Sequence, residues 1–419
     1  MLLSFRFANH RSFRDEQQLN LLPVYGADAS DAGSEATAVP VVGIFGANAS
    51  GKSNVISAFG YLSNMVGQSD KESEPGLGVR RQPFRLDPEV AEMPSSYAVD
   101  LLLDGIRHTY GFTVDDSRIV EEWLYCYPLR RKRVIFDRTG QNFDWGEESG
   151  RSGIRRLADI VAPTALFLSV AARFNLNAPA SEARDETSEV LHRTFSWLWQ
   201  QVSKPMSVNS RRRPYDYARL LDAPGSKRAI VELLKGADVG LREVIQSNED
   251  DASFNRQVYF LHHGSTDDNV LFRISDESSG TLRLLELAGR AIPVLDQGGL
   301  FLVDEIDASL HPLLTAALIR LFRSTEVNAS GAQLLFTTHD ATLLGSIDGD
   351  DVLERDQVWF TSKEDDGASE LFSLADFKPR RQGENRLKRY LNGSYGAIPE
   401  LSMRLFEHAV LSRTDSGAE

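Results

Sequence analysis

The most informative residues of this chain are Gly46-Ala47-Asn48-Ala49-Ser50-Gly51-Lys52-Ser53, which directly follow the apolar run Val41-Val42-Gly43-Ile44-Phe45. The apolar run is typical of a strand buried on both faces. After the loop, Val55, Ile56 and Phe59 recur at helical spacing. The loop itself matches the pattern G-x-x-x-x-G-K-[S/T], which binds phosphate when it lies between a strand and a helix. Both flanks fit, so we predict a phosphate-binding loop rather than a chance glycine-rich turn.

Each residue type in this loop has a chemical reason. Glycines allow backbone N–H groups to surround phosphate oxygens, and the positive end of the helix dipole favours the anion. Lys52 can reach the β- and γ-phosphates, and Ser53 can ligate Mg²⁺. We therefore expect ATP and Mg²⁺ as cofactors, with nucleotide contacts from Gly46, Asn48, Ser50, Gly51, Lys52, Ser53 and Asn54.

A second apolar run, Leu300-Phe301-Leu302-Val303, ends in two carboxylates, Asp304 and Glu305. We expect Asp304 to help hold Mg²⁺ and Glu305 to polarise the attacking water as a general base. An ordinary strand that runs into an acidic loop would look the same in isolation. The phosphate-binding loop upstream favours the catalytic interpretation.

A third motif, Glu277-Ser278-Ser279-Gly280-Thr281, leads into a leucine-rich segment with helical character. A Ser/Gly turn at the start of a helix can bind an anion. The loop at Gly46 already supplies a phosphate cradle within the chain. We therefore expect Ser278 and Gly280 to contact nucleotide held by a second copy of the chain, and the alternative is an ordinary helix cap.

The motifs follow the order phosphate-binding loop, long insertion, Ser-Gly helix start, Asp-Glu strand and the strand Phe336-Thr337-Thr338-His339. This order resembles that of the ABC-type P-loop ATPases. The resemblance implies that His339 senses the γ-phosphate as a second catalytic residue, although a lone histidine is more often structural. It also implies that Asp307 to Pro312 crosses a dimer interface, where His311 is either a contact or a helix-start residue. The expected assembly is a homodimer or higher oligomer closed around ATP.

Two residues nearer the N-terminus extend this resemblance. Arg11, within Asn9-His10-Arg11-Ser12-Phe13, is similar to the early arginine near the nucleotide in SMC- and RecF-like heads. Gln82, within Arg81-Gln82-Pro83-Phe84, is the candidate for the glutamine that couples Mg²⁺ to the lid. We thus expect Arg11 near the nucleotide and Gln82 near the metal.

Three stretches indicate one branch of these ATPases: Phe7 to Phe13, Glu122 to Tyr125, and Tyr390 to Pro399. They resemble stand-alone bacterial proteins of an AAA-type ATPase/GTPase family that includes RloA-like proteins of restriction loci and AbiLi-like abortive-infection proteins. This resemblance implies antiviral defence, in which the ATPase senses infection and controls a separately encoded toxin or nuclease. One departure is that Glu277 and Ser279 replace two residues of the usual signature motif.

Together the motifs predict an α/β fold, an ABC-type P-loop head with a mixed or parallel sheet, an antiparallel β-subdomain and a helical lid insertion. A strand–turn–strand signal occurs at Asp104-Gly105. The expected divisions are the first half of the head at 1–66, the β-subdomain at 67–150, the helical lobe at 151–250, the second half of the head at 251–375 and a tail at 376–419.

The composition constrains partners and location. The 419 residues carry a net charge of −14, which argues against a broadly basic surface that coats nucleic acid. Basic runs at Arg130 to Arg133, at Arg211 to Arg213 and between Lys378 and Arg389 keep a direct nucleic-acid contact open but not favoured. No apolar run approaches the roughly 18 residues of a membrane span, so we expect a cytoplasmic protein. The single cysteine, Cys126, is expected to fill the core.

Two other functions stay open. One is a DNA-maintenance ATPase of the RecF or SMC kind, which would bind DNA across the closed dimer. The other is a scaffold that binds ATP with little turnover. A built-in nuclease of the OLD type is not expected, because the segment after His339 lacks a spaced array of acidic metal ligands, and Glu364, Asp365 and Asp366 fall in a predicted hairpin turn.

Overall fold

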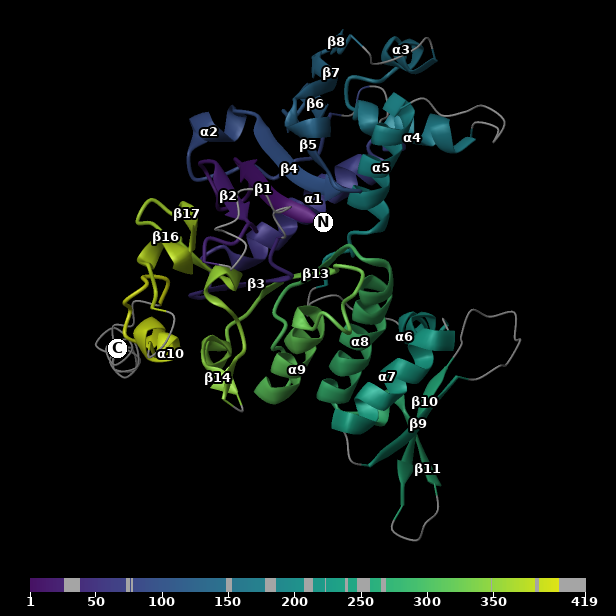
Figure 1. Cartoon of the computed structure of the whole chain (residues 1–419), viewed down its shortest axis with the longest axis vertical. Helices are drawn as coiled ribbons and strands as arrows, with labels where there is room; N and C mark the ends of the chain where they lie inside the picture. Colours follow the sequence, from purple (N-terminus) through teal and green to yellow (C-terminus); the bar gives the residue numbers. More distant parts are fainter. Residues whose placement is uncertain are drawn as a thin grey trace, which may run out of the picture.

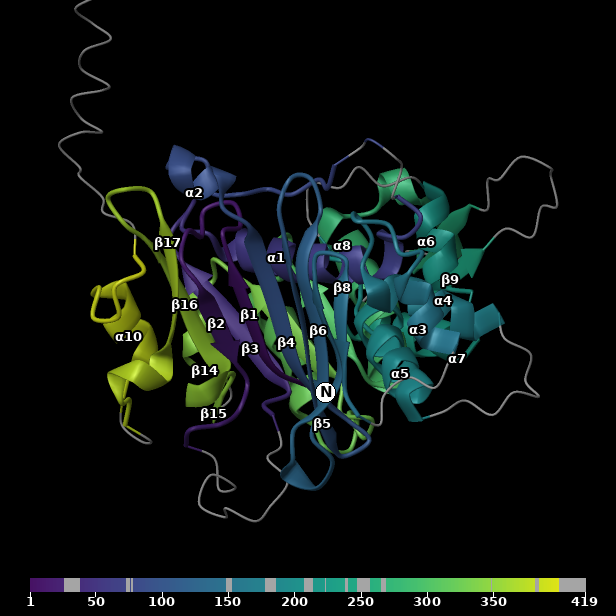
Figure 2. The same cartoon turned by 90° about the horizontal axis from the view of Figure 1, so that it is seen from above.

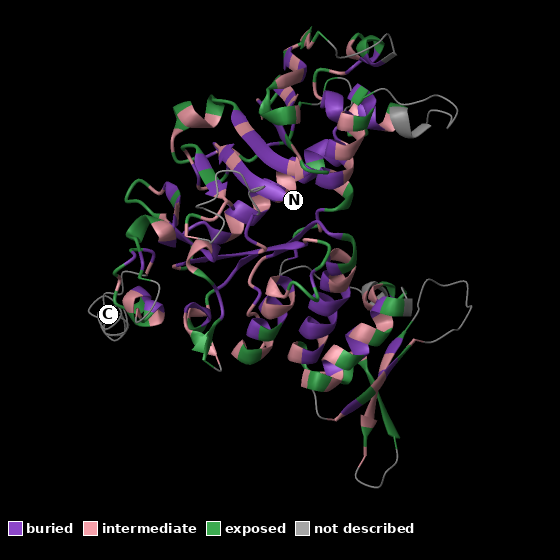
Figure 3. Cartoon of the chain, viewed as in Figure 1, coloured by how far each residue is buried: buried purple, intermediate pink, exposed green. Residues whose placement is uncertain are grey.

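The computed structural model describes residues 1–25, 38–72, 76, 78–147, 153–177, 186–206, 214–222, 224–237, 240–246, 257–264, 269–347, 349–380 and 384–398. Two sheets form the centre of the molecule, with helix α1 (Lys52–Gln68) between them. Helices α8 (Ser279–Gln297) and α9 (Pro312–Arg323) lie on the face of the sheet containing β3 (Val41–Gly46) that is turned away from α1 (Figure 1). Buried residues concentrate in these sheets and at their contacts with the helices (Figure 3). The arrangement confirms the predicted α/β fold.

The central sheet has the strand order β12-β13-β3-β16-β17. Its members are β3 (Val41–Gly46), β12 (Leu300–Val303), β13 (Gln333–Thr337), β16 (Val358–Lys363) and β17 (Ser369–Ser373). The first four strands in this order are parallel, whereas β17 is antiparallel. Because β3, β12 and β13 are parallel neighbours, the loops that follow them meet at one edge of the sheet.

Adjacent side chains of the central sheet pack into different cores, as alternation along a strand requires. Ile44 and Leu302 belong to the core that contains α1. Phe45 and Phe301 belong to the core that contains α8 and α9. This two-sided burial explains why β3 and β12 read as continuous apolar runs in the sequence.

The second sheet is antiparallel, with the order β2-β1-β4-β5-β6-β7-β8. Its strands are β1 (Leu2–Ala8), β2 (Gln17–Asn20), β4 (Ser95–Leu103), β5 (Ile106–Val114), β6 (Ile119–Cys126), β7 (Arg133–Thr139) and β8 (Asn142–Trp145). It packs on α1 through rings such as Phe5 and Phe59, whose centroids lie 4.8 Å apart. The predicted turn at Asp104 and Gly105 joins β4 to β5 with both residues at positive φ. Cys126 is buried in β6.

The chain between the two halves of the head forms two groups of elements. Helices α3 (Gly153–Ala158), α4 (Phe167–Asn177) and α5 (Glu186–Gln200) pack together, and α4 and α5 also contact α1. Helices α6 (Pro214–Leu220) and α7 (Pro224–Ala237) pack on α8 together with a sheet of β9 (Leu241–Gln246), β10 (Val258–His263) and β11 (Asn269–Arg273). Figure 2 shows α3 to α7 on one side of the molecule and α10 (Arg386–Leu391) on the other.

Strand β9 differs from the helix expected throughout 151–250. Leu241 and Val244 are buried, and β9 pairs antiparallel with β10, so long-range pairing overrides the local sequence pattern. Between the two groups, Val202 and Met206 form parallel bridges to Leu300 and Val303 of β12. The insertion therefore covers the open edge of the central sheet.

Smaller elements complete the described structure: α2 (Pro88–Glu92), β14 (Ser346–Ile347) and β15 (Asp350–Asp351). Arg211 to Arg213, Arg381, Pro399 and the tail beyond Arg413 lie outside the described residues. In the part of the chain that the structure describes, no helix combines the length and apolarity needed to cross a membrane.

Candidate functional site

The backbone at two glycines shapes the loop between β3 and α1. Gly46 has a φ of 155° and Gly51 a φ of 109°, a region that favours glycine. A Cβ atom at Gly46 would lie 2.5 Å from the carbonyl oxygen of Thr361, and one at Gly51 would lie 2.7 Å from Oγ of Ser369. Both positions therefore require glycine. Because Gly51 offers no side-chain cap, the first N–H groups of α1 face an open, anion-favouring end of the helix.

Lys52 folds over this loop. Its side chain is 5% exposed, and Nζ donates hydrogen bonds of 2.8 Å to the carbonyl oxygens of Gly46 and Ala47. Burial lowers the pKa of Lys52 to about 8, against the opposing attraction of Asp304, Glu305 and Asp307. Within the described part of the chain, this buried cation donates to carbonyl oxygens and to no carboxylate, which fits a site that binds phosphate.

The other predicted loop residues have different surroundings. Asn48 is exposed at the tip of the loop, and Ser53 and Asn54 are half-buried in the first turn of α1. Ser50 is buried, with Oγ 2.6 Å from Oγ1 of Thr361 on β16. The Ser50 side chain therefore anchors the loop, and we expect its backbone rather than its hydroxyl to contact phosphate.

Asp304 and Glu305 follow β12 directly and share one partner on β13. Oγ1 of Thr337 donates to Oδ1 of Asp304 at 2.7 Å and accepts from the backbone N–H of Glu305 at 2.8 Å. Glu305 has a φ of 53°, which is unusual for a residue with a side chain. Arg283 of α8 donates to the carbonyl oxygens of Asp304 and Glu305, at 3.3 and 2.9 Å. The acidic pair is thus held through the backbone of both residues and through the carboxylate of Asp304.

His339 lies next to Glu305. Nε2 of His339 is 3.7 Å from Oε1 of Glu305, and both side chains are about two-fifths exposed, at 40% and 39%. The backbone N–H of His339 donates to Oδ1 of Asp307 at 3.3 Å. The ends of β3, β12 and β13 therefore bring a lysine, two carboxylates and a histidine to one place, where a triphosphate and a water could be held together.

Arg11 and Gln82 lie together beside the start of α1. Nε of Arg11 donates to Oε1 of Gln82, and Nη1 of Arg11 is 3.4 Å from Oδ1 of Asn54. Asn54 in turn donates to Oγ of Ser12 at 2.7 Å. A pocket of about 420 Å³ opens here, lined by Arg11, Ser12, Gln82, Pro83, Phe84, Arg85, Leu86, Lys363 and Gly367. The placement fits a nucleoside beside the phosphate loop, whereas Gln82 contacts Arg11 in this structure and its metal role stays a prediction.

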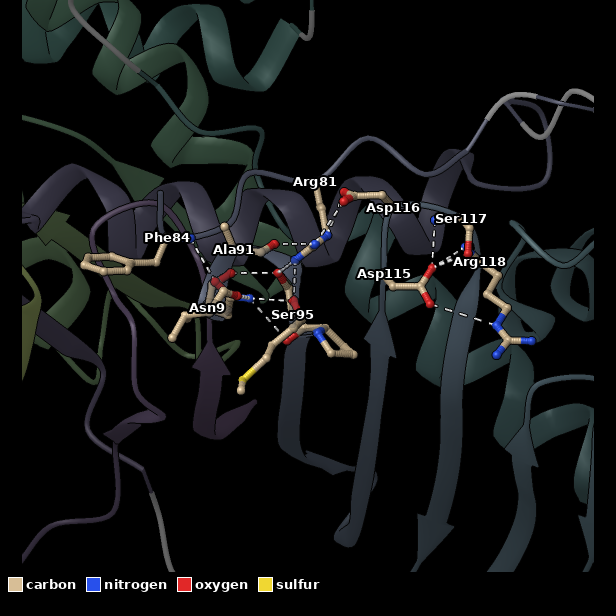
Figure 4. A network of polar contacts seen from close by, with 12 residues as sticks. Asn9, Arg81, Phe84, Ala91, Ser95, Asp115, Asp116, Ser117 and Arg118 are labelled. Carbon is tan, nitrogen blue, oxygen red and sulfur yellow. Dashed lines mark hydrogen bonds and ion pairs between the residues drawn. The ribbon is translucent and has the colours of Figure 1, made fainter. Parts of the chain in front are cut away.

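A buried polar network fixes the segment that carries Gln82 (Figure 4). Oδ1 of Asn9 accepts from the N–H of Phe84 at 2.8 Å, and the carbonyl of Asn9 accepts from Oγ of Ser95 at 2.7 Å. The Arg81 guanidinium, which is fully buried, bonds Asp116 at 2.8 Å. These residues hold the turn containing Arg11 against the segment containing Gln82.

Ser278 and Gly280 begin α8. Oγ of Ser278 accepts from the N–H of Thr281 at 3.0 Å, which is an N-cap contact. A Cβ atom at Gly280 would lie 2.9 Å from the carbonyl oxygen of Ser309, so α8 approaches the segment after Glu305 closely. Among the described residues, no hydrogen bond joins Ser278 or Gly280 to the phosphate-binding loop. His311 caps α9 through Nδ1, which accepts from Leu313 at 3.3 Å.

Sequence reasoning missed several residues that shape this site: Asn9, Arg81, Arg283, Thr337, Thr361 and Ser369. Asn9 and Arg81 lie within the motifs around Arg11 and Gln82, but their partners are distant in sequence. Thr337 precedes His339 in a motif already recognised, which is the one signal that could have identified it.

The fold and the site together define a P-loop ATPase head of the ABC-like kind. Residues 41–345 match the family described as "AAA domain, putative AbiEii toxin, Type IV TA system". This match covers most of the chain, and the protein belongs to that family.

The remaining comparisons are more distant. No curated protein sequence matches this chain. Among solved structures, the chain is similar to a crystal structure of the SmcHead bound to the C-winged helix domain of ScpA. That similarity has 16% sequence identity and a TM-score of 0.41, and it covers 90% of this chain and 99% of the other. At this level it supports no inference about partners.

Proposed function

We propose that this protein is an ATP-hydrolysing switch that closes nucleotide between two copies and thereby controls a separate effector in antiviral defence. The observation that supports hydrolysis most directly is the meeting of Lys52, Glu305 and His339 at the ends of three parallel strands. In this arrangement Lys52 binds the phosphates, Glu305 orients and deprotonates the attacking water, and His339 contacts the γ-phosphate.

The same edge of the sheet fits Mg²⁺. Ser53 lies in the first turn of α1, and Asp304 presents a carboxylate that already accepts a bond from Thr337. Hydroxyl and carboxylate oxygens suit this hard cation, which would supply positive charge against the phosphates. Gln82 is the third proposed ligand, and to serve it must leave Arg11.

A second copy supplies the remaining contacts in this proposal. Ser278 and Gly280 form the N-terminus of a 19-residue helix, a position that attracts anions. Their own chain already supplies the phosphate loop at Gly46. The Ser278 end of α8 is therefore proposed to contact the γ-phosphate held by a partner copy, and two ATP molecules would join the pair.

The defence role rests on family membership and on sequence resemblance. The family description names an AbiEii toxin of a type IV toxin–antitoxin system. The branch-specific stretch from Tyr390 packs behind the phosphate loop, where the Tyr390 ring lies 6.3 Å from the Phe45 ring. We propose that nucleotide state, sensed there and at α8, is passed to a separately encoded toxin or nuclease.

Two variants test the catalytic assignment. Lys52→Ala should abolish ATP binding, because the phosphates lose their buried cation. Glu305→Gln should bind ATP normally but hydrolyse it about 100-fold more slowly or worse, because an amide cannot accept the proton from water. Normal ATP binding by Lys52→Ala, or normal turnover by Glu305→Gln, would refute the respective role.

A DNA-maintenance role is the second candidate, supported by the exposed basic residues Arg130 to Lys132. Direct DNA binding by the isolated protein, weakening steeply as salt is raised, would favour this candidate over control of a protein effector. ATP hydrolysis without such DNA affinity would favour the first.

A further inference from the structure

We infer that Arg283 is a positioning residue that links the Ser278 end of α8 to the catalytic base Glu305 in the same chain. Through this link, ATP bound by the partner copy would control the rate of hydrolysis at the site that contains Glu305. The inference rests on the proposed function and names how that site is regulated. Arg283 touches no nucleotide in this scheme and acts through the backbone of Glu305.

The contacts of Arg283 place it between two parts of the site. It lies five residues after Ser278, on the second turn of α8, and its side chain is 6% exposed. Its guanidinium donates to the carbonyl oxygens of both Asp304 and Glu305. A buried guanidinium whose Nη2 donates to two successive carbonyls restrains the path of the backbone between them.

Glu305 needs such a restraint. Its φ of 53° lies in the left-handed region, which residues with a Cβ adopt at a cost. Thr337 holds the N–H of Glu305 at 2.8 Å, and Arg283 holds the carbonyl at 2.9 Å. The two bonds clamp the residue from both sides and aim its carboxylate toward His339. Release of either side would let Glu305 relax to a conformation in which the carboxylate points elsewhere.

A buried glutamate on the same helix, Glu286, holds the Arg283 side chain against α8. Nη1 of Arg283 is 3.6 Å from Oε2 of Glu286, whose side chain is 1% exposed, and Nη2 of Arg290 is 3.5 Å from Oε1 of the same glutamate. Arg283 and Arg290 therefore share one carboxylate on one helix. The essential difference is that the contacts with Asp304 and Glu305 come from Arg283.

The coupling follows from the stiffness of the first turns of α8. Ser278 caps the helix, and Gly280 lies directly against the carbonyl of Ser309, so the helix start is in contact with the segment after Glu305. When phosphate held by the partner copy draws the Ser278 end toward it, Arg283 is carried along. Glu305 then reaches its working position because the second site is filled, which is a coupling between two ATP sites.

The test compares Arg283→Gln and Arg283→Lys with the matched control Arg290→Gln, in the full-length protein. The control removes a cation from the same buried carboxylate and leaves the Glu305 clamp intact. We expect Arg283→Gln to lower kcat about ten-fold or more while the Kd for ATP changes less than about two-fold. Arg283→Lys should fall between, because it keeps the charge but lacks the planar guanidinium whose Nη2 reaches both carbonyls. Arg290→Gln should keep a kcat near that of the wild type.

The dependence of rate on ATP concentration supplies the readout that a merely structural role would not change. Wild type should give a sigmoidal curve and Arg283→Lys a hyperbolic one. If Arg283→Gln does not fold, Arg283→Lys alone decides. A kcat for the Arg283 variants equal to that of Arg290→Gln would overturn the inference. The proposed function is tested separately by Glu305→Gln. If that variant loses turnover in the same assay, the proposed function stands even when the inference about Arg283 fails.

Discussion

Individual residues in this site are held mainly by backbone groups. Lys52 donates to two loop carbonyls, and Glu305 is held by bonds to its N–H and carbonyl. Neighbouring atoms leave no room for a side chain at Gly46 or Gly51. Because backbone groups do not titrate, the geometry of the loop should persist over a wide pH range, and the pH dependence should come from a few buried side chains.

The first prediction at this scale concerns Lys52. Its pKa of about 8 in the free protein must rise when phosphate oxygens surround it. ATP binding above pH ~8 should therefore take up a proton and weaken as pH rises further. Calorimetry in two buffers of different ionisation enthalpy would measure the uptake. Lys52→Arg, which stays charged, is the control and should bind without this uptake. A Kd for ATP that is constant from about pH 7 to pH 9.5 would contradict the prediction.

The second prediction concerns His10, which lies under the Arg11 turn. Burial lowers the pKa of His10 to about 3, and its ring nitrogens contact Tyr97 and Ser57 at 2.8 and 3.2 Å. The unfolded chain gains a proton near pH 6.5 and the folded chain does not, so stability is complete above about pH 6.5 and falls as pH drops. Between about pH 7 and pH 5 the loss from this residue should be about 2 kcal/mol.

Urea denaturation at the two pH values measures that loss. The variant His10→Gln serves as the comparison because it removes the titrating group. Its free energy of unfolding should fall about 2 kcal/mol less over the same interval. Equal pH dependence in the two proteins would show that His10 does not stay neutral.

At the scale of elements, the predictable helices, strands and turns are those whose own residues show a clear apolar or turn pattern. Strands β3, β12 and β13 were expected because both faces are apolar, and the turn at Asp104 because of its residue types. The hairpin turn at Glu364 to Asp366, between β16 and β17, was also expected. Strand β9 was not, since it is a strand only because β10 pairs with it.

The same distinction divides the residues of the site. The phosphate loop and the Asp304-Glu305 pair carry their pattern within a few residues, so the sequence was enough to propose them. Arg283 and Thr337 gain their roles from bonds to residues 22 and 32 positions away in sequence. Such roles follow only from the packing of α8 and β13 beside β12.

One prediction at this scale tests the packing of α5 on α1. A Cβ atom at Gly67 would overlap the indole ring of Trp199, so Gly67→Ala must displace α5. We expect a loss of about 1–3 kcal/mol in the free energy of unfolding. Gly236 in α7 has none of the described atoms within 4 Å of its Cβ position, so Gly236→Ala should instead stabilise by roughly 0.5–1 kcal/mol. Denaturation curves for both variants check this, and a neutral Gly67→Ala would contradict the packing.

At the scale of the whole molecule, the insertion reaches both sides of the nucleotide site. Its first group contacts α1, and its second group packs on α8, while residues 201–206 run beside β12 between them. One continuous segment thus touches the helix after the phosphate loop, the strand before Glu305 and the helix that begins at Ser278. An effector that bound the insertion would be well placed to respond to closure of the site.

The central claim is that ATP joins two copies, and the molar mass of Glu305→Gln in solution tests it most directly. Without nucleotide the protein should have the mass of one chain. With ATP and Mg²⁺ it should double its mass, because the variant binds ATP without consuming it, and Lys52→Ala should remain at the mass of one chain under both conditions. A mass for Glu305→Gln that does not change when ATP and Mg²⁺ are added, with ATP binding confirmed, would contradict the account.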